Sequence, residues 1–153
     1  MPVQTNPYRR RRGLTLPEML IAIIVIVLLS AMAFPSTARR IRHGRVNQAA
    51  NIIAVDLENA VSSAARQRKP IRITSSPGAT MFTVADRATG TVLRRREVGQ
   101  QTEWKLATLS FSETTVDVFP TGVTSAPLTV TVGDGSYTRQ IRLTRAGLVQ
   151  VVQ

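Results

Sequence analysis

One acidic residue lies near the start of a long apolar run, and it is the first candidate for a chemical role. Residues 14–34 read LTLPEMLIAIIVIVLLSAMAF, and Glu18 is the only charged side chain among them. A carboxylate in apolar surroundings is unfavourable unless it is paired, whereas a paired one fixes the register of its partner. Glu18 is therefore a candidate functional residue, and an interfacial glutamate without such a role is the alternative.

Residue types for other chemistry are scarce. The chain has no cysteine and one histidine, His43. Thiolate metal sites are therefore excluded, and few residues could serve as the base or the thiol of a catalytic nucleophile–base pair. The acidic residues of the carboxy-terminal half are scattered, and Gly133-Asp134-Gly135 is interpreted as a hairpin turn rather than a calcium loop. We therefore expect no enzymatic activity, no metal and no cofactor.

A basic segment precedes the apolar run. Arg9, Arg10, Arg11 and Arg12 lead into Gly13, and the run that follows is long enough to cross a bilayer, for which about 20 helical residues suffice. A secretory signal peptide is disfavoured, because the apolar region is too long and residues 33–36 make a poor cleavage site. A plain signal anchor is the stronger alternative.

This amino-terminal segment, RRRRGLTLPEML, resembles the prepilin peptidase signature of the type IV pilin-like family. The resemblance implies that a membrane peptidase cuts between Gly13 and Leu14 on the cytoplasmic side and methylates the new amine of Leu14. It also implies that Glu18 pairs with a free amino terminus in a growing filament. Leu14 replaces the usual phenylalanine. Pro17 precedes the glutamate at little cost, because the first helical N–H groups have no intrahelical partner.

The element that must carry these residues is a long helix. Its amphipathic continuation has apolar residues at spacings of three and four, with cations near its end at residues 66–69 and a stop at Pro70. We predict one helix from about Thr15 to Arg68, transmembrane in its first half and amphipathic in its second. The predicted stripe comprises Val46, Ala50, Ile53, Leu57, Val61 and Ala64.

After Pro70 the pattern alternates with a period of two, and Gly- and Pro-containing turns separate the runs. Such short runs predict antiparallel meanders with one face on the helix stripe, an α+β arrangement. The predicted strands are Ile71–Thr74, Thr80–Ala85, Thr91–Arg96, Trp104–Phe111, Thr115–Phe119, Leu128–Val132, Arg139–Leu143 and Leu148–Val152.

The carboxy-terminal end carries a second resemblance. VFPTG at 118–122, the hairpin LTVTVGDGSYTRQIRL and the closing TRAGLVQVV resemble the end of the GspH/FimT domain of type II secretion pseudopilins and type IV minor pilins. The resemblance implies the pilin fold and a structural subunit that acts near the tip of a pilus or pseudopilus. The expected organisation is a leader at 1–13, a transmembrane segment at 14–34, an amphipathic helix at 35–69 and a β-rich head at 70–153.

The expected partners follow from this picture: prepilin peptidase, other pilins or pseudopilins, and the bacterial inner membrane, crossed once with the head outside the cytoplasm. Two alternatives remain open. A membrane-anchored β-domain without a filament role is one. The other is a DNA-binding minor pilin that uses Arg139, Arg142 and Arg145 on phosphates, in keeping with a net charge of +11.

Overall fold

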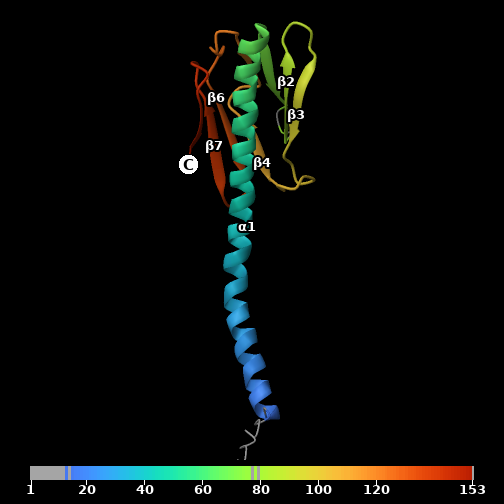
Figure 1. The fold of residues 1–153 in the computed structure, drawn as a ribbon, viewed down its shortest axis with the longest axis vertical. Helices are drawn as coiled ribbons and strands as arrows, with labels where there is room; N and C mark the ends of the chain where they lie inside the picture. Colours follow the sequence, from blue (N-terminus) through green and yellow to red (C-terminus); the bar gives the residue numbers. More distant parts are fainter. Residues whose placement is uncertain (1–12, 14, 77, 79, 153) are drawn as a thin grey trace, which may run out of the picture. The chain divides into compact units, whose positions relative to one another are not determined.

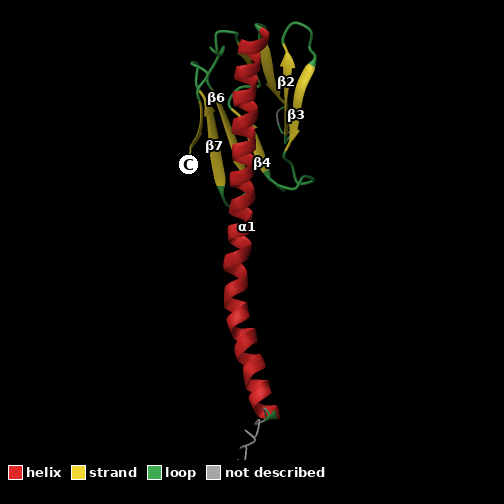
Figure 2. Cartoon of the chain, in the orientation of Figure 1, coloured by secondary structure: helices red, strands yellow, loops and turns green. Residues whose placement is uncertain are grey.

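A single helix, α1 (Leu16–Gln67), precedes eight strands in the computed structural model, which describes residues 13, 15–76, 78 and 80–152 and, of residues 32–36, only the backbone. The predicted helix is therefore confirmed (Figures 1 and 2). Its last residue is followed by Arg68, which has a left-handed φ of 53°, and then by Pro70, which cannot continue a helix. The chain divides into two compact units, residues 1–39 and 40–153.

All eight predicted strands are present in the unit formed by residues 40–153, and their ends agree within two residues in all but one case. The exception is β4, which begins at Thr108 rather than at Trp104. Lys105 has a φ of 50° and its N–H bonds to the carbonyl of Thr102, so the chain turns there and cannot yet be extended. The strands are β1 (Ile71–Ser75), β2 (Met81–Asp86), β3 (Val92–Glu97), β4 (Thr108–Phe111), β5 (Thr115–Val118), β6 (Leu128–Gly133), β7 (Thr138–Leu143) and β8 (Val149–Val152).

The strands form two four-stranded antiparallel sheets, where one layer of meanders was expected. Their orders are β3-β2-β1-β5 and β4-β6-β7-β8. The meanders β1–β3 and β6–β8 are present, and each sheet is completed by a strand from the middle of the chain. Only residues 112–114 separate β4 from β5, so the chain changes sheets within one tight connection. These long-range pairs left no local pattern in the sequence.

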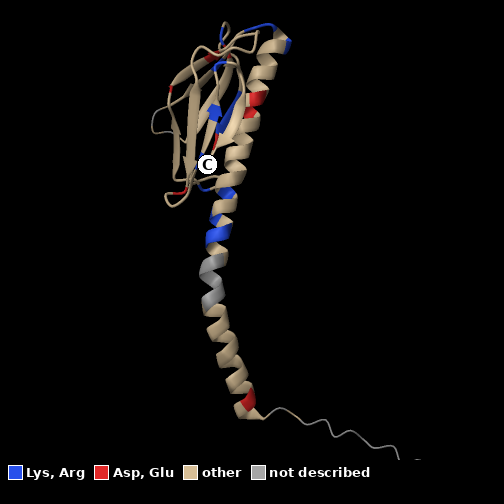
Figure 3. Ribbon diagram, turned by 90° about the vertical axis from the view of Figure 1, so that its left-hand side faces the viewer, with Lys and Arg blue, Asp and Glu red and all other residues tan. Residues whose placement is uncertain are grey.

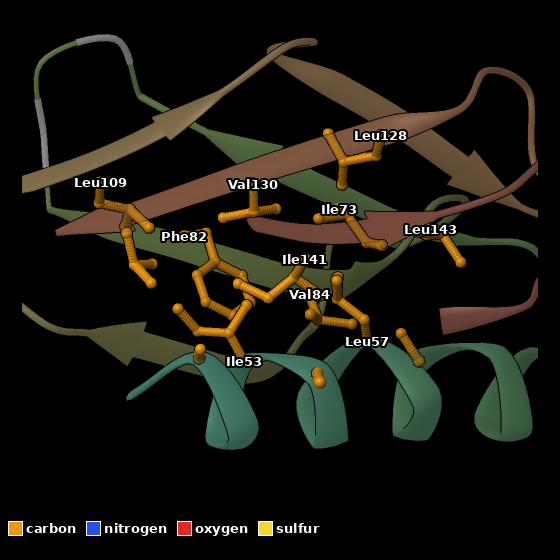
Figure 4. Packing of buried hydrophobic residues seen from close by; sticks show 14 of the residues in the cluster. Ile53, Leu57, Ile73, Phe82, Val84, Leu109, Leu128, Val130, Ile141 and Leu143 are labelled. Carbon is orange, nitrogen blue, oxygen red and sulfur yellow. The ribbon is translucent and has the colours of Figure 1, made fainter. Parts of the chain in front are cut away.

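The core of this unit lies between the two sheets and the second half of α1 (Figure 4). Ile53 and Leu57 of the helix stripe contact a cluster that includes Phe82 and Val84 of β2 and Ile141 of β7. Phe82 also packs on Phe111 of β4, with ring centroids 5.6 Å apart, which ties one sheet to the other. The predicted stripe is confirmed as the buried face, although Val61 at its edge is only partly buried.

Two glycine turns meet beside the end of the helix. Gly147, at a φ of 77°, precedes β8, and a Cβ there would lie 2.3 Å from the carbonyl oxygen of Gly122 and 3.4 Å from Val61. A backbone hydrogen bond also joins the two turns, because the N–H of Thr124 donates to the carbonyl of Arg145 at 2.9 Å. Both turns fall in segments that the sequence predicted as turns, and Gly147 is required by conformation and by space alike.

Candidate functional site

The predicted assembly residue, Glu18, lies in the first turn of α1 and is exposed. Its Oε2 accepts a long hydrogen bond of 3.5 Å from the N–H of Thr15, whose carbonyl accepts from the N–H groups of Glu18 and Met19. Thr15 is thus the N-cap, and Glu18 reaches back to it as the glutamate of a capping box does. The Thr-x-x-Glu spacing was a signal for this cap that our sequence analysis did not use.

The predicted cleavage and methylation site is only partly visible. Gly13 is exposed with no neighbour near its Cβ position, whereas Leu14 and the arginines at 9–12 lie outside the described residues. The unit formed by residues 1–39 also exposes every large apolar side chain from Leu16 to Leu29, from 48% at Val25 to 82% at Leu16. An apolar surface of this extent marks a region that meets lipid or protein.

The predicted membrane span, residues 14–34, extends beyond the described residues, since Leu14 and the side chains of residues 32–34 are not part of them. Within the part of the chain that the structure describes, no helix is both long enough and apolar enough to cross a membrane.

The three arginines considered as DNA contacts do not form one patch. Arg139 and Arg142 alternate along β7, so Arg139 lies on the side of buried Ile141 and Arg142 faces outward. Arg139 donates a 2.8 Å hydrogen bond to Asn47 of α1 and lies over the ring of Tyr137. Arg142 and Arg145 are exposed, and among the described residues neither is in an ion pair.

Three consecutive arginines, residues 94–96, lie on β3, and two of them approach Asp56 of α1. Asp56 on α1 is 3% exposed and accepts hydrogen bonds from Nε and Nη2 of Arg96, at 2.6 and 3.1 Å. Arg94 lies farther away, with its Nε 3.5 Å from Asp56 Oδ1. The hydrogen bond to Asp56 raises the pKa of Arg96 above its ordinary value, so the guanidinium remains charged. Figure 3 shows the acidic and basic residues along this helix.

A second ion-pair network joins β1 and β5. Arg72 donates from Nε and Nη2 to the two carboxylate oxygens of Asp117, at 2.7 and 3.1 Å, and Arg87 approaches to 3.3 Å. The hydrogen bonds from Arg72 lower the pKa of Asp117 below its ordinary value. Arg72 and Asp117 lie directly opposite each other on the two paired strands, so their attraction reinforces the register of the sheet.

The single histidine takes part in a polar cluster at the β6–β7 hairpin. His43 stacks on Tyr137 with ring centroids 4.2 Å apart, and Tyr137 donates to Asn47 at 3.3 Å. Asp134 closes the hairpin turn, as predicted, by accepting from the N–H groups of Ser136 and Tyr137. Burial works to raise the pKa of Asp134, but these hydrogen bonds outweigh it and lower the pKa. Among the described residues no group of three or more metal-ligating side chains occurs.

Comparisons with known proteins identify the family of the chain. Residues 49–147 match the family model of the type II transport protein GspH, and residues 8–34 match the prokaryotic N-terminal methylation motif. Fold and motif together define a minor pilin or pseudopilin subunit. The chain belongs to the GspH family, as the resemblance of its carboxy-terminal end implied. Members and structural relatives are structural subunits rather than enzymes.

The fold is similar to two solved structures of this kind. One is the type IV minor pilin FimU of Pseudomonas aeruginosa, at 18% identity and a TM-score of 0.57. The match covers 70% of this chain and 92% of FimU. The other is the minor pseudopilin EpsH from the type 2 secretion system of Vibrio cholerae, at 10% identity, a TM-score of 0.52 and coverages of 71% and 96%. No curated protein matches the chain significantly. The predicted α+β pilin fold is confirmed.

Proposed function

We propose that the chain is made as a precursor, is cut between Gly13 and Leu14 by prepilin peptidase, and is methylated on the amine of Leu14. The methylation motif at residues 8–34 is the observation that carries this proposal, because it spans the basic leader, the glycine and the apolar run. In the mature subunit Leu14 would lie one residue before the N-cap Thr15, at the start of α1.

The first half of α1 anchors the subunit in the inner membrane, in a single pass, with the head outside the cytoplasm. Its apolar side chains, exposed all along residues 16–29, support this placement, since lipid or neighbouring helices would cover them. The same surface then packs against other pilins when the subunit enters a pilus or pseudopilus, near its tip. The head carries no catalytic group in this proposal and acts as a structural part.

Glu18 sets the register of the subunit in that filament by pairing with the amino terminus of a neighbour. Its carboxylate is exposed, and its only hydrogen bond among the described residues is the long one to Thr15, so it is available to a stronger donor. In surroundings of low dielectric constant an ammonium partner would be favoured over the neutral N–H.

The deciding experiment is the intact mass and amino-terminal sequence of the full-length protein extracted from the membranes of its host. We expect a chain that begins at Leu14 and is heavier by one methyl group. A retained leader, or a cut elsewhere, would contradict the proposal and favour a signal-anchored β-domain. A Gly13→Val variant serves as the control, because the bulkier residue at the cut should leave the leader in place.

DNA binding is a second candidate function, favoured by the exposure of Arg142 and Arg145 near the last hairpin. Arginines without acidic partners can neutralise phosphates and release counterions. Binding to duplex DNA should then weaken with salt and weaken further in the double variant Arg142→Ala with Arg145→Ala. Unchanged binding in that variant would remove this surface from consideration, and Arg139→Ala is the control at a packed position.

A further inference from the structure

Two adjoining hollows lie between α1 and the edge strand β3, within the unit of residues 40–153. Their volumes are about 230 and 350 Å³, and both are lined by Asp56, Asn59 and Arg94. Together they form one groove along helix residues 51–66 and strand residues 93–96, called here the α1–β3 groove. Its helix wall is about 22 Å long over fifteen helical steps, which suits an extended segment of chain rather than a small molecule.

The groove has an excess of positive charge. Of the described residues that line it, three are arginines, Arg66, Arg94 and Arg96, and one is an acid, Asp56. Asp56 is satisfied by the two hydrogen bonds from Arg96, so Arg94, half-exposed at 3.5 Å, has guanidinium donors to spare. Among the described residues no acid pairs with Arg66. The guanidinium of Arg66 and the remaining donors of Arg94 are therefore matched to carboxylates on an incoming partner.

One wall of the groove is the unpaired edge of a sheet. Among the strands that the structure describes, β3 pairs with β2 alone, so the other side of its backbone offers hydrogen-bonding groups to an added strand. Apolar side chains line the groove from both walls: Val55 of the helix is 52% exposed and Leu93 of β3 is 43% exposed. A segment that alternates acidic and apolar residues could place its carboxylates on the arginines and its apolar groups on Val55 and Leu93.

We propose that the α1–β3 groove binds an extended, acidic segment of a different subunit of the same filament. A second copy of this chain does not supply an alternating acidic segment. Its extended parts contain no two acids at positions i and i+2, and Asp56 and Glu58, which have that spacing, are both in α1. The partner is thus another protein, and the proposal rests on assembly with other pilins as proposed above.

The test measures binding of a peptide of alternating glutamate and valine to the full-length protein in detergent, by calorimetry and by the fluorescence of Trp104. Trp104 is the only tryptophan, and the Arg96 guanidinium carbon lies 6.0 Å from the centroid of its ring. We expect the peptide to bind and to change this fluorescence, and a glutamine–valine peptide to bind about tenfold more weakly or worse.

Matched variants then locate the site. Arg94→Gln and Arg66→Gln should each weaken binding about tenfold, because each removes one charge-assisted contact. Arg95→Gln removes the neighbouring charge on β3, which alternation directs to the other face and which does not line the groove, so binding should be unchanged. Unfolding midpoints equal to that of the wild type show that the variants are folded.

Four results would overturn the proposal. They are no binding of the glutamate–valine peptide, equal binding of the glutamine–valine peptide, and equal weakening by Arg95→Gln and Arg94→Gln. The fourth is displacement of the peptide by a DNA oligonucleotide in a manner that depends on Arg94, which would assign the groove to phosphates. Each concerns binding in solution, so cleavage at Gly13 and incorporation into a filament can still be observed when this proposal fails.

Discussion

Arg96 and Asp56 form a two-bonded ion pair between the edge strand β3 and the helix, with Nε 2.6 Å from Oδ2 and Nη2 3.1 Å from Oδ1. The aspartate is 3% exposed, so its charge is removed from water and is compensated mainly by Arg96, with Arg94 farther away at 3.5 Å. The pair therefore fixes where an otherwise exposed strand lies on α1.

Asp56→Ala tests that dependence. The substitution leaves Arg96, whose side chain is 22% exposed, without its counter-ion. We expect the free energy of unfolding to fall by about 3 kcal/mol, as for other broken buried pairs. Urea unfolding of the full-length protein in detergent measures it. Arg95→Gln on the same strand should change it by less than about 0.5 kcal/mol, and an equal effect of the two variants would contradict the prediction.

The Asp117–Arg72 pair predicts a dependence of stability on pH. The hydrogen bonds from Arg72 lower the pKa of Asp117 in the folded state below its ordinary value of 3.8. A lowered folded-state pKa gives stability that is present above the unfolded-state pKa and is lost as pH falls through the folded one. Asp117→Asn should therefore be less stable than the wild type at neutral pH, and the difference should shrink below about pH 3.8. A difference that stays constant down to pH 2 would refute this.

The contact between two glycine turns makes Gly147 sensitive to a single methyl group. In Gly147→Ala the new Cβ would meet the Gly122 carbonyl oxygen at 2.3 Å and also take a left-handed φ. We expect a loss of about 3 kcal/mol in the free energy of unfolding. Gly90→Ala is the control, because Gly90 has a similar φ of 71° with nothing within 4 Å, and it should lose only about 1 kcal/mol. Similar losses in both would show that the close approach does not matter.

Arg68 offers a stabilising change. It follows the last residue of α1 with a φ of 53°, a position that favours glycine. Arg68→Gly relieves this strain, although glycine also raises the conformational entropy of the unfolded chain, which offsets part of the effect. We therefore expect a rise of about 0.5 to 1 kcal/mol in the free energy of unfolding. Arg66→Gly, inside the last helical turn, should instead lower it by about 1 kcal/mol. Destabilisation by both variants would disprove the strain.

Glu18→Ala tests the proposed register of assembly. Without the carboxylate the subunit cannot pair with a neighbouring amino terminus, so we expect it to accumulate in the membrane, cut at Gly13, and to be absent from purified filaments. Immunoblots of membrane and filament fractions measure both. Glu58→Ala, an exposed acid later in α1, should be incorporated normally. Normal incorporation of Glu18→Ala would exclude the register role.

Periodicity made the elements of this fold predictable. The three- and four-residue spacing from Val46 to Ala64 identified the buried face of α1, and alternation identified all eight strands. The start of β4 was wrong because the left-handed turn at Lys105 is set by its local hydrogen bond, not by residue pattern. The Thr15–Glu18 cap could have been recognised from its spacing.

Contacts between distant parts of the chain were the unpredictable part. Nothing near Asp56 in the sequence indicates that its partner is Arg96, 40 residues later, and the same holds for Arg72 and Asp117. Alternation along the strand separates Arg95 from Arg94 and Arg96, but it does not indicate that the latter two pair with Asp56. Arg139 was likewise taken as a surface residue and is bonded to Asn47 of the helix.

The pairing of β1 with β5 has a consequence for the order of events during folding. Arg72 and Asp117 are 45 residues apart, so the sheet that begins at Ile71 stays incomplete until the chain has been delivered as far as Val118. Until then one side of β1 remains open, and a large loop must close before it gains its partner. We expect the head to fold slowly and in one step, with its first half sensitive to proteases until the last third of the chain arrives.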